Sequence, residues 1–173
     1  KGQVDTRLLA KLLAHPYLSQ APPKSTGREA FGTKMLDELL NWQHTRRLSV
    51  EDLLATCSRW TAEAVGTARR WIKGGIDDVI VGGGGVRNRA IMGHLTDIFA
   101  PVPVTSFEAH GWDSKALESV AFAVLAYQTV MEQCGNVPSV TGAASPRILG
   151  CIVPSGPQWY EQLRSRKGGS KKK

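Results

Sequence analysis

Hydrophobic residues recur at spacings of three and four in three stretches of the N-terminal half, which predicts amphipathic helices. The first helix covers residues 4–14, and His15-Pro16 ends it because the residue before a proline disfavours the helical conformation. The second runs from about 30 to 42, and the third, from 50 to 73, starts where Ser49 and Asp52 have the spacing of a capping box. We expect the third helix to bury one stripe of side chains: Leu53, Cys57, Trp60, Ala64, Ala68 and Trp71.

After Gly74-Gly75 the pattern changes to short β-branched runs alternating with helical stretches. It predicts a strand at 76–81, a helix at 88–98, a strand at 102–105 and a helix at about 113–132, with residues 148–153 as a candidate last strand. This order indicates an α/β fold whose strands pair in parallel through right-handed crossovers. The helix at 113–132 is apolar nearly all round, so we expect it deep in the core. Two or three strands form a thin sheet for so many helices, which suggests that further strands lie outside this sequence.

Four consecutive glycines, Gly82 to Gly85, separate the strand at 76–81 from the helix at 88–98. Glycine lets the flat face of a ligand lie against the main chain, and a turn at the carboxyl end of a parallel strand is where open α/β folds bind nucleotides. The run has neither the Walker pattern nor Gly-x-Gly-x-x-Gly. A tight turn that uses its glycines only for positive φ is the alternative. Asn88 fits a helix N-cap and a ligand contact equally well.

The net charge of +7 is typical of a nucleic-acid-binding protein, but the positive charges are unevenly distributed along the chain. Six of the positive charges lie in residues 164–173, which contain no acid, so the preceding part of the chain is nearly neutral. We therefore expect a folded domain over residues 1–155 and a basic, disordered tail over 156–173. Nucleic-acid binding is not the expected function, since only this tail suggests it.

The three cysteines, Cys57, Cys134 and Cys151, are far apart, and the sequence has no Cys-x-x-Cys pair. A disulfide framework and a zinc site are both disfavoured, and reduced thiols fit a cytoplasmic protein. No stretch has the length and purity of a membrane span, and the first residues show no signal-peptide pattern.

Two further places offer polar groups to a ligand. Glu118 is the single carboxylate between Asp113 and Glu132, and a buried carboxylate needs a cation, a metal or hydroxyl donors as partner. A structural ion pair and a site role are both open for it. The second place is a proline-stiffened loop over residues 21–29 that could grip an anion or could be a solvated loop; its polar residues are Lys24, Ser25, Thr26 and Arg28.

Four segments together resemble the anhydro-N-acetylmuramic acid kinases. Residues 22–29, Pro-Pro-Lys-Ser-Thr-Gly-Arg-Glu, look like a loop of that family, and residues 81–95 are similar to its Gly-Gly-Gly-x-x-Asn-x-x-x-Met-x-x-Leu segment. Gly111, Glu118 and residues 121–123 resemble its Gly…Glu-Ala-x-Ala-Phe-Ala helix, and residues 135–143 resemble a loop near its C-terminus. The likeness runs from residue 3 to about 155. The levoglucosan kinases share the pattern, so the anhydro sugar stays open.

The resemblance implies an actin-like, sugar-kinase and Hsp70-type fold with two RNase H-like lobes and ATP between them. It implies that Gly83, Gly84 and Gly85 line the adenosine side, that Asn88 lies near the base or ribose, and that Glu118 faces the sugar and Mg2+ region. Family members use ATP and Mg2+ to open the 1,6-anhydro bond of a sugar with water and to phosphorylate its O6. An aspartate would act as general base before in-line phosphoryl transfer.

This sequence departs from the family pattern in one large respect. The family's phosphate-binding Gly-Thr-Ser-x-Asp-Gly motif and its catalytic aspartate belong to the N-terminal lobe, and neither occurs here. Smaller departures are Trp112, Asp113, Lys115 and Ser119. We therefore expect a C-terminal, helix-rich lobe that has no catalytic residue of its own, with an anhydro sugar, the other lobe and a homodimer as candidate partners. A nucleotide-binding or regulatory module without catalysis is the main alternative.

Overall fold

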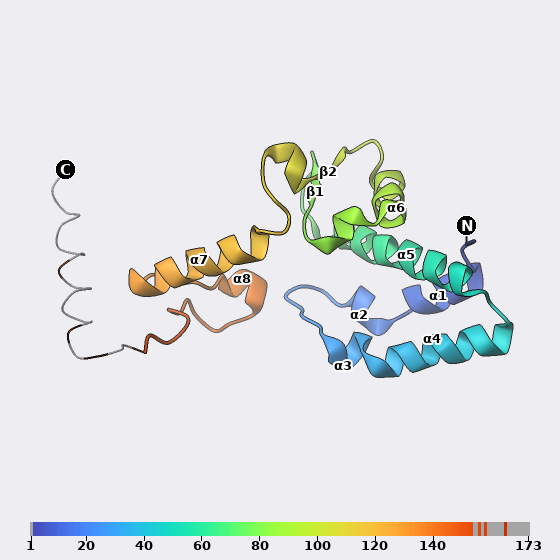
Figure 1. Cartoon of the computed structure of the whole chain (residues 1–173), viewed down its shortest axis with the longest axis horizontal. Helices are drawn as coiled ribbons and strands as arrows, with labels where there is room; N and C mark the ends of the chain where they lie inside the picture. The colour runs from blue at the N-terminus through green and yellow to red at the C-terminus, as the bar shows by residue number, and fades with distance from the viewer. Residues whose placement is uncertain (1, 154–155, 157, 159–164, 166–173) are drawn as a thin grey trace.

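The computed structural model describes residues 2–153, 156, 158 and 165 (Figure 1). Its α-helices are α1 (Thr6–Leu13), α2 (Pro16–Ser19), α3 (Arg28–Phe31), α4 (Thr33–Arg46), α5 (Val50–Gly66), α6 (Arg89–Phe99), α7 (Leu117–Val130) and α8 (Pro138–Thr141). The strands are β1 (Val79–Val81) and β2 (Val104–Ser106), and three short 3-10 helices are η1 (Thr67–Trp71), η2 (Gly84–Arg87) and η3 (Phe107–His110). The tail predicted for 156–173 lies almost wholly outside the described residues.

The two strands pair in parallel, with Val79 opposite Val104 and Val81 opposite Ser106. Helix α6 lies between them in the chain, so the predicted α/β unit with a crossover helix is confirmed. Both strands are shorter than predicted. The candidate strand at 148–153 is wrong: these residues are irregular, and the carbonyl of Leu149 accepts a hydrogen bond from Thr129 Oγ1 at 2.6 Å instead of a strand partner.

Helix α5 contributes to two separate apolar clusters. The first joins Leu8 and Leu12 of α1 to Leu53 of α5, and side chains of α4 pack against it. The second joins Ala62 of α5 to Leu95 and Phe99 of α6, and the inner face of the sheet covers it. In Figure 1 α5 runs between α1 and α6, in agreement with this double role. The second cluster therefore packs α6 and the sheet against α5.

The predicted stripe on the long helix is correct only in its first half. Leu53 is buried and Cys57 and Trp60 are partly buried, but Ala68 is exposed and Trp71 is 38% exposed. The reason is local: α5 ends at Gly66, and the chain continues as η1, whose tighter winding turns later side chains away from the α-helical stripe. A further helix, α2, was not predicted; it starts at Pro16 with the His15 ring accepting a hydrogen bond from the Tyr17 N–H at 3.2 Å.

One buried hydroxyl fixes the N-terminal segment to α5. Thr56 is fully buried, and its Oγ1 accepts a hydrogen bond from Asp5 N–H at 2.9 Å while donating to the Asp52 carbonyl at 2.7 Å. Asp5 in turn caps α1 by accepting from Leu8 N–H at 2.6 Å. A buried polar group is tolerated when its hydrogen bonds are satisfied, as they are here. The start of α1 is therefore held in register with α5.

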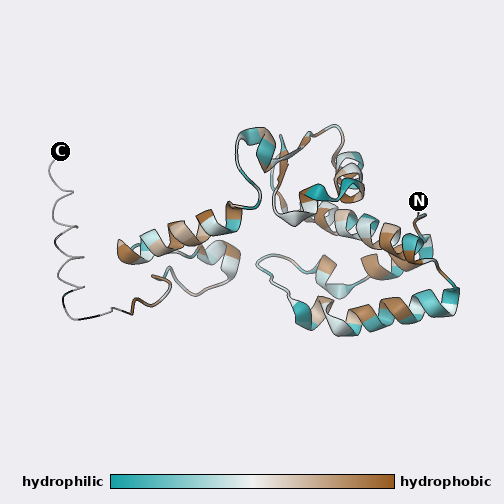
Figure 2. Ribbon diagram, viewed as in Figure 1, coloured by the Kyte–Doolittle hydropathy of each residue, from teal (hydrophilic) through white to brown (hydrophobic). Residues whose placement is uncertain are grey.

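The burial predicted for the helix at 113–132 is wrong. Helix α7 has no buried residue, and Phe122 and Tyr127 are 64% and 60% exposed. Figure 2 shows hydrophobic residues on α7 where it extends away from the sheet and from α5 and α6. The all-round apolar pattern can be buried only if neighbours cover every side, and the part of the chain that the structure describes covers only some of them. No described helix has the length and apolar character to cross a membrane.

Candidate functional site

The first glycine of the run is held by packing. A Cβ on Gly82 would lie 2.7 Å from Cδ2 of the Phe107 ring, closer than real contacts allow, and 3.0 Å from Cδ2 of Leu117, which is tighter than most real contacts. Gly82 directly follows β1, Phe107 starts η3, and Leu117 starts α7. The glycine therefore lets three elements meet at the carboxyl end of the strand.

The other three glycines are open. Space for a Cβ is free at Gly83, Gly84 and Gly85, with no atom within 4 Å. Only Gly83 has a positive φ, of 79°. A turn that used its glycines only for positive φ would need one of these three, so turn geometry does not explain Gly84 and Gly85. They leave a strip of bare, accessible backbone, which favours a surface for a flat ligand.

Asn88 is the N-cap of α6, as its residue type suggests. Its side-chain oxygen accepts hydrogen bonds from the N–H groups of Ala90 at 3.0 Å and Ile91 at 3.2 Å. Within the described part of the chain, its amide nitrogen donates no hydrogen bond. Capping therefore uses one end of the side chain and leaves a donor at the mouth of the turn.

Glu118 is exposed and lies in the first turn of α7. The expectation that it is a buried carboxylate with an obligatory partner is therefore wrong, because α7 itself is not buried. Its neighbour Leu117 meets Gly82, which places the start of α7 beside the glycine turn. The described residues contain no group of three or more His, Cys, Asp or Glu side chains that could hold a metal, so Glu118 belongs to no such group.

Glu108 is a residue that the sequence did not single out. Its carboxylate accepts hydrogen bonds from the Ser114 hydroxyl at 2.9 Å and the Ser114 N–H at 3.3 Å, and so closes the loop between η3 and α7. Its own backbone N–H, together with the hydroxyls of Ser114 and Ser106, holds the pKa of Glu108 at about 2, below its ordinary value of 4.5. Glu108 thus positions the start of α7 against the glycine turn.

The depressed pKa of Glu108 predicts a pH dependence of stability. A carboxyl with a lower pKa in the folded state stabilises fully above its unfolded value of about 4.5 and loses that effect as pH falls towards 2. We expect Glu108→Gln to melt at a lower temperature than the wild type at pH 6. The gap in melting temperature should shrink steadily below pH 4.5 and be smallest near pH 2. Thermal melts of both proteins across this range measure it, and a gap that is constant with pH would contradict the prediction.

The loop at 21–29 is only partly available to an anion. Lys24 donates a hydrogen bond from Nζ to the Tyr17 carbonyl at 2.9 Å and lies 4.5 Å from the centre of the Tyr17 ring. Ser25, Thr26 and Arg28 are exposed. No hydrogen bond or ion pair among the described residues joins them to the glycine turn. The structure therefore assigns Lys24 a role in holding the loop and leaves Arg28 as its accessible cation.

Two of the segments singled out in the sequence meet in space. A Cβ built on Gly142 would lie 3.4 Å from Cγ of Pro23. The loop at 21–29 therefore lies against the segment 135–143. Figure 1 shows the tip of the α2–α3 loop directed towards α8. Asn136 shapes that segment, accepting from Arg147 N–H at 2.6 Å and donating to the Ser145 carbonyl at 3.1 Å. The loop at 21–29 and the segment 135–143 are thus parts of one larger surface.

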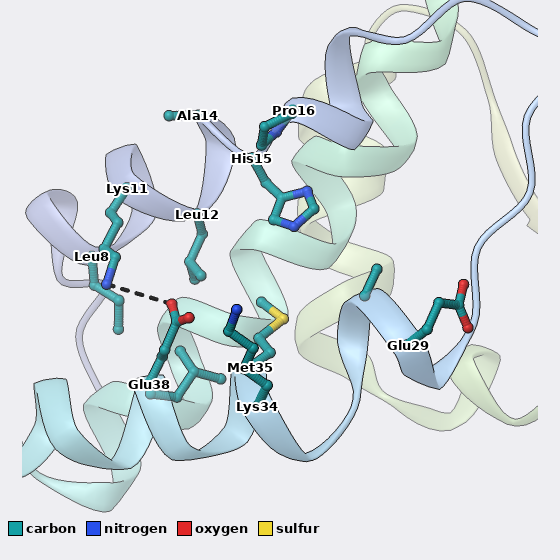
Figure 3. A pocket seen from close by; sticks show the side chains of 12 residues that line it. Leu8, Lys11, Leu12, Ala14, His15, Pro16, Glu29, Lys34, Met35 and Glu38 are labelled. Carbon is teal, nitrogen blue, oxygen red and sulfur yellow. Dashed lines mark ion pairs between the residues drawn. The ribbon is translucent and has the colours of Figure 1, made fainter.

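A pocket of about 380 Å³ lies between the first four helices, away from the glycine turn (Figure 3). Leu8, Leu12 and Met35 supply apolar lining, and Lys11 forms an ion pair with Glu38 at 3.8 Å. Of the loop residues considered above, only Glu29 borders it. The pocket is therefore separate from any nucleotide site at the sheet.

Comparison with known proteins identifies the family. The sequence model of the anhydro-N-acetylmuramic acid kinases matches residues 1–155. The chain belongs to the anhydro-N-acetylmuramic acid kinase family. The match includes the glycine turn, the capping Asn88, Glu118 and both loops that meet at Gly142, so the resemblance drawn from these motifs is confirmed at the level of the family.

Curated relatives in this family carry the same description. The chain is 39% identical over 158 residues to the anhydro-N-acetylmuramic acid kinase of Clostridioides difficile and 43% identical over 153 residues to that of Cupriavidus pinatubonensis. It is 42% identical over 154 residues to the kinase of Xanthomonas oryzae pv. oryzae. These alignments cover 88–89% of this chain but only 40–41% of each relative. The chain therefore spans about 40% of the length of the curated relatives that it matches.

Proposed function

We propose that this chain is the adenosine-binding, C-terminal lobe of an ATP-dependent anhydro-sugar kinase with an actin-like fold. The observation that carries the proposal is the open backbone at Gly84 and Gly85, at the carboxyl end of a parallel strand in a chain of this kinase family. Neither glycine is required by φ or by packing. A base or ribose that must lie against the main chain would supply a reason for both glycines.

The residues around the turn suit ATP. Gly83, Gly84 and Gly85 would face the adenosine, and the side-chain amide of Asn88 could donate to an acceptor on the base or ribose. Glu118 at the start of α7 would lie towards the sugar and Mg2+. Mg2+ is commonly bound through one or two carboxylates together with substrate phosphates and water, so a single carboxylate is compatible with it. Arg28 is the accessible cation of the loop at 21–29.

The substrate proposed for the whole enzyme is 1,6-anhydro-N-acetylmuramic acid. Water would open the 1,6-anhydro bond, and the γ-phosphate of ATP would be transferred to O6 in line. The general base is expected to be an aspartate outside this sequence, so this chain alone is proposed to be inactive. Levoglucosan is the competing substrate. A non-catalytic nucleotide-binding module is the competing function.

Nucleotide binding by the glycine turn is tested by Gly84→Val/Gly85→Val. We expect the double change to weaken Mg-ATP binding by roughly tenfold or more, because two branched side chains would occupy the strip where adenosine lies. Isothermal titration of the 173-residue chain with Mg-ATP measures the change.

Gly93→Ala is the matched control. Gly93 lies within α6, a Cβ there has open space, and alanine favours a helix. We expect this variant to bind Mg-ATP like the wild type. An unchanged affinity in the double variant, in a protein whose circular dichroism matches the wild type, would remove the adenosine assignment.

A further inference from the structure

Helix α7 presents an apolar surface that the described chain leaves open. Val124 is half exposed, at 50%, in addition to the exposed rings of Phe122 and Tyr127. Within α7, Glu118 is the single charged residue. Exposed apolar side chains gathered on one helix mark an interaction site, because leaving them in water is unfavourable.

The outer face of the sheet is open as well. Val79 and Val81 face the cluster around Phe99, whereas Ile80 points to the other side and is 45% exposed. Parallel sheets are normally covered on both faces. β1 and β2 pair only with each other among the described residues, so each also has an unpaired edge. The contact of Leu117 with Gly82 connects this end of the sheet to the start of α7.

The composition of α7 argues against a membrane as the covering surface. A helix that lies on a bilayer has a polar face rich in Lys and Arg, and α7 contains neither. Its 14 residues are also too few to span a bilayer, which takes about 20. A protein surface remains, and the relatives indicate which one: they contain this segment in chains of which about 60% is not matched here.

We propose that the exposed surface of α7 and the outer face of the sheet at Ile80 together form the docking surface for the remaining portion of the kinase. That portion is the polypeptide that corresponds to the unmatched part of the relatives. Its own apolar layer would cover Phe122 and Tyr127, and a strand of it would extend the sheet. The inference deepens the proposed function and rests on it for the nature of the partner.

The test is association in trans. The part of the Clostridioides difficile relative that lies outside its match to this chain is produced separately and titrated with the 173-residue chain. We expect a complex of one copy of each, measured by light scattering. Phe122→Ser/Tyr127→Ser should weaken it at least tenfold, and Ile80→Thr, which keeps strand propensity, should weaken it measurably.

Leu36→Ser/Leu54→Ser is the control. These side chains are 53% and 61% exposed, on α4 and α5, so the same loss of apolar surface occurs elsewhere. We expect association to be unchanged. The proposal is overturned if no complex forms, or if both double variants weaken it equally. It is likewise overturned if the chain alone dimerises through α7 or binds neutral phosphatidylcholine vesicles through it.

The same titration separates this inference from the nucleotide assignment. Gly84→Val/Gly85→Val alters open backbone away from Phe122 and Tyr127, so it should leave association intact while weakening ATP binding. Association without ATP binding would refute only the nucleotide site. ATP binding without association would refute only the docking surface.

Discussion

In Phe99→Ala, the free energy of unfolding is expected to fall by about 3–5 kcal/mol, the usual cost of truncating a buried phenylalanine to alanine. Phe99 is 4% exposed and forms, with Leu95 and Ala62, the cluster that joins α5 to α6. Its ring also packs beneath the Arg69 guanidinium, whose carbon lies 5.3 Å from the ring centre. The cavity would open directly under the strand that leads into the glycine turn. Urea denaturation followed by circular dichroism measures the loss.

Phe122→Ala provides the matched control for Phe99→Ala. It makes the same chemical change in a side chain that is 64% exposed. In the chain alone we expect a shift within about 0.5 kcal/mol, as for ordinary surface positions. Comparable losses in the two variants would contradict the placement of the core in the α5–α6 cluster and the exposure of α7.

The second large effect concerns catalysis. The 173-residue chain alone is expected to form no phosphorylated product from ATP and 1,6-anhydro-N-acetylmuramic acid. Loss of a general base alone typically costs about 10²–10⁴ in rate, and the grip on the phosphates would be missing too. A fusion of the unmatched part of the Clostridioides difficile relative to residues 1–173 should restore turnover. Coupled detection of ADP with identification of the sugar phosphate measures both proteins.

Controls for the fusion separate folding from chemistry. The intact relative serves as the active reference, and a fusion that carries Gly84→Val/Gly85→Val should fold but lose most of its activity at low ATP. Levoglucosan is offered in parallel, because faster turnover of that sugar would replace the proposed substrate. Product from the chain alone would contradict its proposed inactivity, and a folded fusion inactive on both sugars would refute the kinase function.

The parts of the fold that local chemistry controls were predictable. Asn88 caps α6, Ser49 accepts from Asp52 N–H at 3.1 Å at the start of α5, and the two β-branched runs pair in parallel. Each of these depends on residues a few positions apart, or on the alternation of strand and helix. The end of α5 was not predictable, since the change to the 3-10 winding of η1 leaves the helical spacing of Ala68 and Trp71 intact in the sequence.

Features that depend on distant neighbours could not be predicted from spacing. An all-round apolar helix indicates that α7 is to be covered, but the pattern does not contain the identity of the covering element. The prediction that Glu118 is buried assumed that α7 lies in the core, and Glu118 is exposed because the described chain does not cover α7. Glu108 gave no periodic signal, because its importance comes from Ser114, six residues away across a turn. The roles of Gly83, Gly84, Gly85 and Asn88 towards ATP stay predictions.

The division within the glycine run bears on how this protein can change over generations. Substitution at Gly82 would force the side chains of Phe107 and Leu117 to shift, so it is disfavoured by packing whether or not a ligand binds. Substitution at Gly84 or Gly85 meets open space, so only a ligand would make it harmful. A descendant that lost the ligand would keep the first glycine and drift at the other two. The spectrum of tolerated alleles at four adjacent codons would therefore record whether the ligand is still in use.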